Sequence, residues 1–152
     1  KDTISKILKV KDSEWRFGLK KQKLWFKENI QKNDIHILIE YKKKIIGYLL
    51  LRDRKCNYNK IKKNYYFFDT LLIIKKFRQK NLSKLLINKS LELIKKKKYF
   101  SVLICNKNKI SFYAKFGWML SNKIFILDYK EKKHKMIFNK KINRRLDILI
   151  NS

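Results

Sequence analysis

Residues 69–86 combine a strand-like run, a basic polar loop and the start of a helix, which is an arrangement that can bind an anion. The segment reads DTLLIIKKFRQKNLSKLL. The first N–H groups of a helix have no partner within the helix, and together with the helix dipole they attract phosphate. Arg78, Lys80 and Lys84 add positive charge around that point. The segment therefore predicts a diphosphate site, although a basic loop before a helix can also be only a solvated surface turn.

Hydrophobic periodicity indicates an α/β chain around this segment. Strands are expected at 4–10, 35–41, 45–52, 65–74 and 99–105, with a closing hairpin of 118–127 and 135–139. Helices are expected at 13–31, split by Gly18, at 83–97, and in a short stretch after the N-cap Asn106 that ends at Gly117. Residues 55–64 read as a polar, basic loop, and the tail after Lys140 is ambiguous. The run 65–74 is almost continuously apolar, as expected for a central strand covered on both faces.

The segment 69–86 resembles the GNAT superfamily of acyl-CoA-dependent N-acetyltransferases. The family pattern is D-T-L-x-V-x-P-x-[YF]-R-G-x-G-[IL]-[GS]-x-x-L-[LI]. It is matched here without a gap by Asp69, Thr70, Leu71, Leu72, Ile73, Phe77, Arg78, Gln79, Lys80, Asn81, Leu82, Ser83, Leu85 and Leu86. Asn81 and Ser83 replace family glycines, and Asn tolerates the positive φ that glycine adopts better than other side chains do.

A second stretch resembles another pattern of the same family, N-x-x-[A]-x-x-[LF]-Y-x-K-x-G-[FW]. The matching residues are Asn106, Phe112, Tyr113, Lys115, Gly117 and Trp118, with Lys109 in the usual alanine position. The two patterns occur in the family's order and cover 69–118. Gly47 extends the likeness more weakly over 35–127.

The resemblance implies one N-acetyltransferase domain over residues 1–152. Its expected sheet is mixed, mostly antiparallel, with about six or seven strands splayed between the fourth and fifth and flanked by helices. The implied reaction is direct attack by an amine of a small molecule or peptide on acetyl-CoA, the co-substrate, without a metal. The implied cofactor-binding residues are Leu72, Ile73, Ile74, Arg78, Gln79, Lys80, Asn81, Leu82, Ser83, Asn106 and Tyr113.

The resemblance also implies roles for two catalytic residues. Tyr113 occupies the position of the family's general acid, which protonates the departing thiolate; otherwise it only contacts CoA or packs with Phe112 and Phe116. Asp69 shares a strand face with Leu71 and Ile73 by period-two alternation. It is therefore a candidate base or substrate anchor, or else a carboxylate that bonds only to neighbouring backbone or lysines.

The net charge of +29 allows a different function, a basic nucleic-acid-associated protein on a degenerate acetyltransferase scaffold. Its phosphate contacts would be the basic stretches 55–63 and 130–135. However, the 35 Lys, 21 Ile and 13 Asn against one Ala and no Pro indicate codon drift in an A/T-rich genome. Proteins that recognise base edges in the DNA grooves also favour Arg, which occurs only six times here. Nucleic acid is therefore not the expected partner, and if the charge does matter it favours an anionic acceptor.

Two cysteines without metal-ligand spacing, and no apolar run of bilayer length, predict a cytoplasmic protein without a membrane span. The sequence leaves a monomer and a homodimer equally open.

Overall fold

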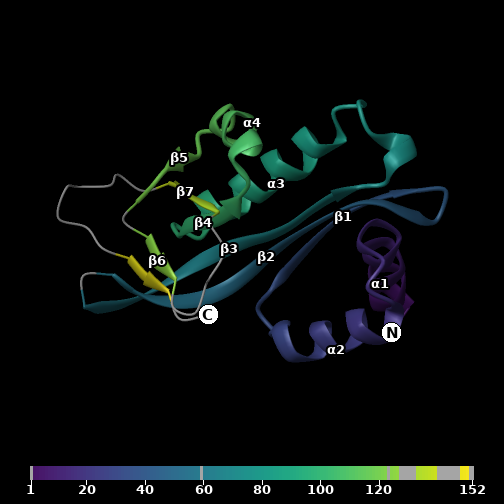
Figure 1. The fold of residues 1–152 in the computed structure, drawn as a ribbon, viewed down its shortest axis with the longest axis horizontal. Helices are drawn as coiled ribbons and strands as arrows, with labels where there is room; N and C mark the ends of the chain where they lie inside the picture. Colours follow the sequence, from purple (N-terminus) through teal and green to yellow (C-terminus); the bar gives the residue numbers. More distant parts are fainter. Residues whose placement is uncertain (1, 59, 123, 127–132, 140–147, 151–152) are drawn as a thin grey trace. The chain divides into compact units, whose positions relative to one another are not determined.

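The computed structural model describes residues 2–58, 60–122, 124–126, 133–139 and 148–150 as an α/β fold (Figure 1). The helices are α1 (Asp2–Trp15), α2 (Leu19–Asn29), α3 (Leu82–Lys96) and α4 (Ile110–Ala114), with 3-10 turns η1 (Lys75–Phe77) and η2 (Lys107–Lys109). The strands are β1 (Ile35–Tyr41), β2 (Lys44–Tyr58), β3 (Ile61–Ile73), β4 (Phe100–Cys105), β5 (Met119–Leu120), β6 (Ile124–Ile126), β7 (His134–Phe138) and β8 (Ile148–Ile150).

The chain contacts itself in two compact units. The first unit contains Lys1–Arg52 and Thr70–Ser90, and the second contains Asp53–Asp69 and Leu91–Ser152. Strands β2 and β3 and helix α3 run from one unit into the other, so each unit holds part of these three elements.

In the first unit, β1 pairs with β2 as an antiparallel hairpin in the register Ile35↔Leu51 to Tyr41↔Lys44. This confirms the predicted strands and the turn between them, at which Lys42 and Lys43 adopt positive φ. The buried cluster of this unit lies between the hairpin and the two N-terminal helices. Its members are Ile7, Val10, Ile45, Tyr48, Leu50 and Leu72, with Trp25, Phe26, Ile30, Leu38 and Ile74 packed against them.

The predicted strand at 4–10 was wrong, because these residues lie inside α1. Ile4, Ile7 and Leu8 have the spacing i, i+3, i+4 of one helix face, which competes with strand alternation in so short a segment. Burial of Ile7, Leu8 and Val10 on that face decides for the helix.

The predicted long helix at 13–31 divides at Gly18, as expected, but its first part belongs to α1. Gly18 has φ 87°, a conformation that side-chain-bearing residues rarely adopt, and its N–H donates to Asp12 Oδ1 at 2.7 Å. Asp12 therefore stabilises the break between α1 and α2.

The second unit contains the sheet order β5-β7-β4-β3-β2-β8-β6. Strands β3 and β4 pair in parallel from Tyr65↔Phe100 to Phe68↔Leu103, and β6 pairs in parallel with β8, whereas β7 is antiparallel to both β4 and β5. The described residues form eight strands where six or seven were expected. The predicted mixed, mostly antiparallel sheet is confirmed.

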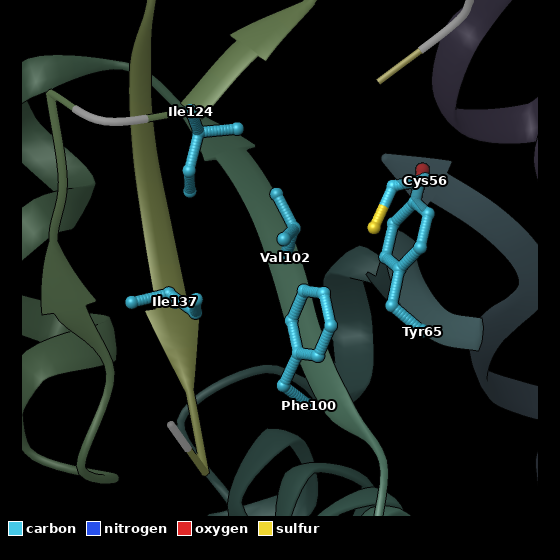
Figure 2. Packing of buried hydrophobic residues seen from close by; sticks show 6 residues of the cluster. All are labelled: Cys56, Tyr65, Phe100, Val102, Ile124 and Ile137. Carbon is cyan, nitrogen blue, oxygen red and sulfur yellow. The ribbon is translucent and has the colours of Figure 1, made fainter. Parts of the chain in front are cut away.

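The predicted loop at 55–64 was also wrong, because β2 continues to Tyr58 and β3 begins at Ile61. Figure 2 shows the reason, which is that Cys56 lies beside Tyr65 in a buried cluster with Phe100, Val102, Ile124 and Ile137. On β2, Lys55 and Asn57 alternate with Cys56 and Tyr58, and Tyr58 also packs against this cluster.

The predicted closing hairpin is only partly correct. Strand β5 pairs with β7, but β6 pairs with β8, a strand in the tail that the sequence left ambiguous. Residues 127–132, which include the end of the first predicted strand of the hairpin, lie outside the described residues. In the described helices, none has the length and apolar composition needed to cross a bilayer.

Candidate active site

The loop between β3 and α3 has the backbone conformation expected of a glycine-rich phosphate loop, although it contains no glycine. After η1, Gln79 has φ 65° and Asn81 has φ 55°, both in the left-handed region. These are the two positions at which the family pattern has R-G-x-G glycines, so the expected positive φ at Asn81 is confirmed. Gln79 adopts it as well, at a higher steric cost because Gln lacks the local tolerance of Asn.

The helix that follows begins at Leu82, one residue before the predicted start. Leu85 N–H donates to Asn81 O at 3.4 Å, which closes the first turn of α3. The N–H groups of Leu82, Ser83 and Lys84 precede it and have no acceptor inside the helix. Ser83 therefore lies in the first turn and not at the N-cap. Lys80 and Lys84 are both exposed, and the Lys80 ammonium lies 5.7 Å from the centroid of the Phe77 ring.

Strand β3 presents an edge of backbone groups just before this loop. Ile74 N–H donates to Ile46 O of β2 at 3.0 Å. A trans peptide holds its C=O opposite its N–H, so the Ile73 carbonyl points away from β2. In an extended strand the Ile73 N–H lies on the same side as its carbonyl. These two groups therefore face the edge that the resemblance assigns to the pantetheine arm.

Gly47 on β2 makes room for the side chain of Ile73. A β-carbon at Gly47 would lie 2.9 Å from Ile73 Cδ1 and 3.3 Å from Leu86 Cδ1. The glycine therefore lets β3 and α3 pack closely on β2 at Ile73, where the exposed backbone edge of β3 begins.

Arg78 is held by two groups of the first unit. Its Nε donates to Ile73 O at 3.0 Å, and its Nη2 is ion-paired with Glu14 on the last turn of α1. Glu14 is a residue that the sequence did not single out. It is 64 positions from Arg78, and no periodicity or motif connects two residues so far apart.

Tyr113 lies in an aromatic cluster of the second unit. Its ring centroid is 5.8 Å from that of Phe68, 5.1 Å from that of Phe112 and 6.5 Å from that of Trp118. Burial, with a smaller contribution from Cys105, raises the pKa of Tyr113 to about 12. The phenol therefore keeps its proton throughout the neutral range and has a proton to donate.

Helix α4, which carries Tyr113, ends as the sequence predicts. Gly117 has φ 86°, and its N–H donates to Ala114 O at 3.0 Å, which closes the helix in the left-handed conformation that favours glycine. Asn106 is the N-cap residue of η2, but its exposed side chain makes no capping hydrogen bond. Only its carbonyl participates, accepting from Lys109 N–H at 2.9 Å.

Asp69 and Tyr113 are not brought to the same face of β3. Phe68 contacts Tyr113, and successive strand residues point to opposite faces, so the half-buried Asp69 points to the other face. Cys105 is a buried free thiol, and burial raises the pKa of this thiol.

The glycine positions of the loop provide a test of its strain. We expect Gln79→Gly to raise the free energy of unfolding by about 1 kcal/mol, because glycine adopts positive φ without a Cβ clash. Asn81→Gly should raise the free energy of unfolding by less, since Asn already tolerates the left-handed region. Urea unfolding of both variants measures the difference. Equal or lower stability for Gln79→Gly would show that the left-handed conformation is not strained.

The mixed sheet with a left-handed loop directly before α3 is the arrangement that the resemblance implies for an acyl-CoA-dependent transferase. The profile of the "Acetyltransferase (GNAT) family" matches residues 4–118. The chain therefore belongs to the GNAT acetyltransferase family, and the resemblance seen in its two motifs is confirmed.

Solved structures with the same fold include three that cover most of the chain. The PaiA N-acetyltransferase of Thermoplasma acidophilum, in complex with coenzyme A, is 15% identical with a TM-score of 0.63, covering 91% of this chain and 94% of its own. An acyl-CoA N-acyltransferase of Pseudomonas aeruginosa is 12% identical with a TM-score of 0.68, covering 89% of both chains. An aminoglycoside 6'-N-acetyltransferase complexed with coenzyme A is 9% identical with a TM-score of 0.67, covering 88% of both chains. No curated protein matches the sequence. At these identities the structural likeness supports the fold and not the acceptor.

Proposed function

We propose that this chain is an N-acetyltransferase that transfers the acetyl group of acetyl-CoA to an amine of a small molecule or peptide. The observation that carries the proposal is the left-handed backbone at Gln79 and Asn81 in a loop without glycine. Lys42, Lys43 and Lys98 also adopt positive φ, so positive φ alone does not point to a ligand. What supports a phosphate ligand is that Gln79 and Asn81 turn the chain directly before the N-terminus of α3. Coenzyme A bound to structural relatives supports the same ligand.

In the first unit, the diphosphate of acetyl-CoA binds the opening N–H groups of α3, with Arg78, Lys80 and Lys84 as counter-charges. The pantetheine arm follows the β3 edge at Leu72, Ile73 and Ile74. The Ile73 N–H, which points away from β2, is the candidate donor to the developing oxyanion.

The chemical step requires the nitrogen to lose two protons. A lysine-like ammonium has a pKa of about 10.4, so the first proton must leave before attack. The neutral amine then attacks the thioester carbonyl carbon, the C–S bond breaks, and the thiolate takes a proton from the phenol of Tyr113. The nitrogen releases its second proton as the amide forms, and this proton returns to the phenolate through water. The base is needed for the first proton. We assign this proton to Asp69 or to water near it. Asp69 lies on the face of β3 opposite Phe68, so the acid and the base act from different sides of the strand.

Thermal unfolding with and without acetyl-CoA tests the proposal. A ligand at about 100 times its dissociation constant stabilises the folded state by roughly 2.7 kcal/mol. In a chain of this length we expect the melting temperature to rise by about 5 to 10 °C. Adenosine at the same concentration is the control, because it lacks the diphosphate. No shift with millimolar acetyl-CoA would contradict the proposal, and a salt-sensitive shift with duplex DNA or RNA alone would favour a nucleic-acid-associated protein.

A further inference from the structure

Arg78 is restrained at both ends of its guanidinium group. Its Nε donates to the Ile73 carbonyl at 3.0 Å, and its Nη2 is ion-paired with the carboxylate of Glu14. Ile73 O lies on the edge of β3 that faces away from β2, as the bond from Ile74 N–H to Ile46 O requires. The guanidinium is therefore fixed beside the proposed cofactor edge.

A guanidinium has five N–H donors in a planar fork. Two of them serve Ile73 and Glu14, and three remain for other acceptors. The side chain of Arg78 is 44% exposed, so these donors are accessible. A plane held at two points turns its remaining donors in one direction, which suits bidentate binding of a phosphate oxygen pair.

The carboxylate of Glu14 is unexpected at a site that is proposed to bind an anionic cofactor. The sequence has only 12 acidic residues against 41 basic ones. One of these acidic residues, Glu14, forms an ion pair with the arginine of the loop before α3. By charge alone, a carboxylate here repels a diphosphate and weakens its binding. If Glu14 positions Arg78, it should instead strengthen diphosphate binding. An arginine without this restraint must lose conformational freedom when it binds the ligand, whereas a restrained one has already lost it.

We propose that Glu14 is a positioning residue for acetyl-CoA: with the Ile73 carbonyl, it holds the Arg78 guanidinium oriented toward the diphosphate. The proposal rests on the function proposed above. It gives helix α1 a role in cofactor binding, although α1 lies outside both family patterns at 69–86 and 106–118.

Calorimetric titration with coenzyme A tests the proposal on three variants. Glu14→Ala removes both the charge and the acceptor, whereas Glu14→Gln removes the charge but keeps an oxygen that can accept from Arg78. We expect Glu14→Ala to weaken coenzyme A binding by roughly tenfold and Glu14→Gln by less, the size of one lost charge-assisted hydrogen bond. Glu28→Ala, an exposed carboxylate on α2, is the matched control for the loss of one negative charge and should not weaken binding.

Steady-state kinetics adds a readout that a merely structural ion pair would not change. The KM for acetyl-CoA should rise in Glu14→Ala while kcat stays the same, because Glu14 does not touch the reacting atoms. In an Arg78→Lys background, Glu14→Ala should cause no further loss, since lysine cannot make both contacts. The melting temperature of each variant without ligand checks that it folds.

The outcomes separate this inference from the proposed function. If the wild-type protein binds coenzyme A and Glu14→Ala binds it equally or more tightly, charge repulsion is the main effect of Glu14 and the inference is wrong. If the wild-type protein itself does not bind coenzyme A, the proposed function fails and this inference fails with it.

Discussion

Tyr113→Phe is expected to lower kcat by about 100-fold to 1000-fold while changing the affinity for acetyl-CoA by less than about threefold. General acid catalysis contributes factors in this range, and the substitution removes only the hydroxyl that is proposed to donate the proton. The ring keeps its contacts with Phe68, Phe112 and Trp118, so the packing of α4 is preserved. Steady-state rates together with calorimetric binding of coenzyme A measure the two effects separately.

The pH dependence provides a second readout for Tyr113. Burial raises its pKa to about 12, so the wild-type phenol stays protonated and kcat should show no loss from this group below about pH 11. The free energy of unfolding should depend on pH in the same direction as kcat, with a loss only at high pH. Because the folded pKa lies above the unfolded value near 10, this contribution to stability is complete below about pH 10 and is lost as the pH rises toward 12.

Phe116→Leu is the matched control for Tyr113→Phe, because Phe116 belongs to the same aromatic cluster through Phe112 and carries no hydroxyl. Its kcat should stay near the wild-type value. Wild-type turnover in Tyr113→Phe would exclude the phenol as the acid and leave contact with CoA as its only role.

Trp118→Ala is expected to destabilise the folded chain by about 3 to 5 kcal/mol, the cost of removing a large buried aromatic side chain. Trp118 is 2% exposed, and its ring centroid lies 5.5 Å from Phe68 and 5.6 Å from Phe138. A loss of this size is a large part of the roughly 5 to 15 kcal/mol that stabilise most domains. Urea unfolding followed by circular dichroism measures it.

Trp118→Phe separates packing from hydrogen bonding at the same position. The indole N–H is buried and has no hydrogen-bond partner within the part of the chain that the structure describes. Replacing Trp118 with phenylalanine keeps most of the ring contacts and removes an unsatisfied donor. We therefore expect Trp118→Phe to lower the free energy of unfolding by less than about 1.5 kcal/mol. If Trp118→Phe costs as much as Trp118→Ala, the N–H has a bonding partner that stabilises the fold, and packing is not the main contribution.

The errors in the predicted fold have a common physical origin. At 4–10 the apolar residues fit both a helix face and a short strand, and only burial against the rest of the first unit selects α1. At 55–64 the composition is typical of a loop, yet Cys56 packs against Tyr65 and Phe100 and extends β2. Local pattern is a weak guide wherever contacts between distant segments decide which residues are buried.

The loop before α3 shows the opposite case. The order of strand, loop and helix and the positive φ at Asn81 were predictable, because they depend on residues within a few positions of one another. The environment of Tyr113 was not. Its raised pKa depends on burial among rings from β3, α4 and the residue after Gly117, which the sequence separates by up to 50 positions.

The sequence alone determined the family and the left-handed backbone at Asn81 before α3, since each depends on residue types at short, fixed spacing. Only the tertiary structure decided that Glu14 lies on Arg78 and that Asp69 and Phe68 serve opposite faces of β3 beside the Tyr113 cluster. The reason is that contacts between residues tens of positions apart arise from how helices and strands pack, and packing depends on the burial of many side chains at once.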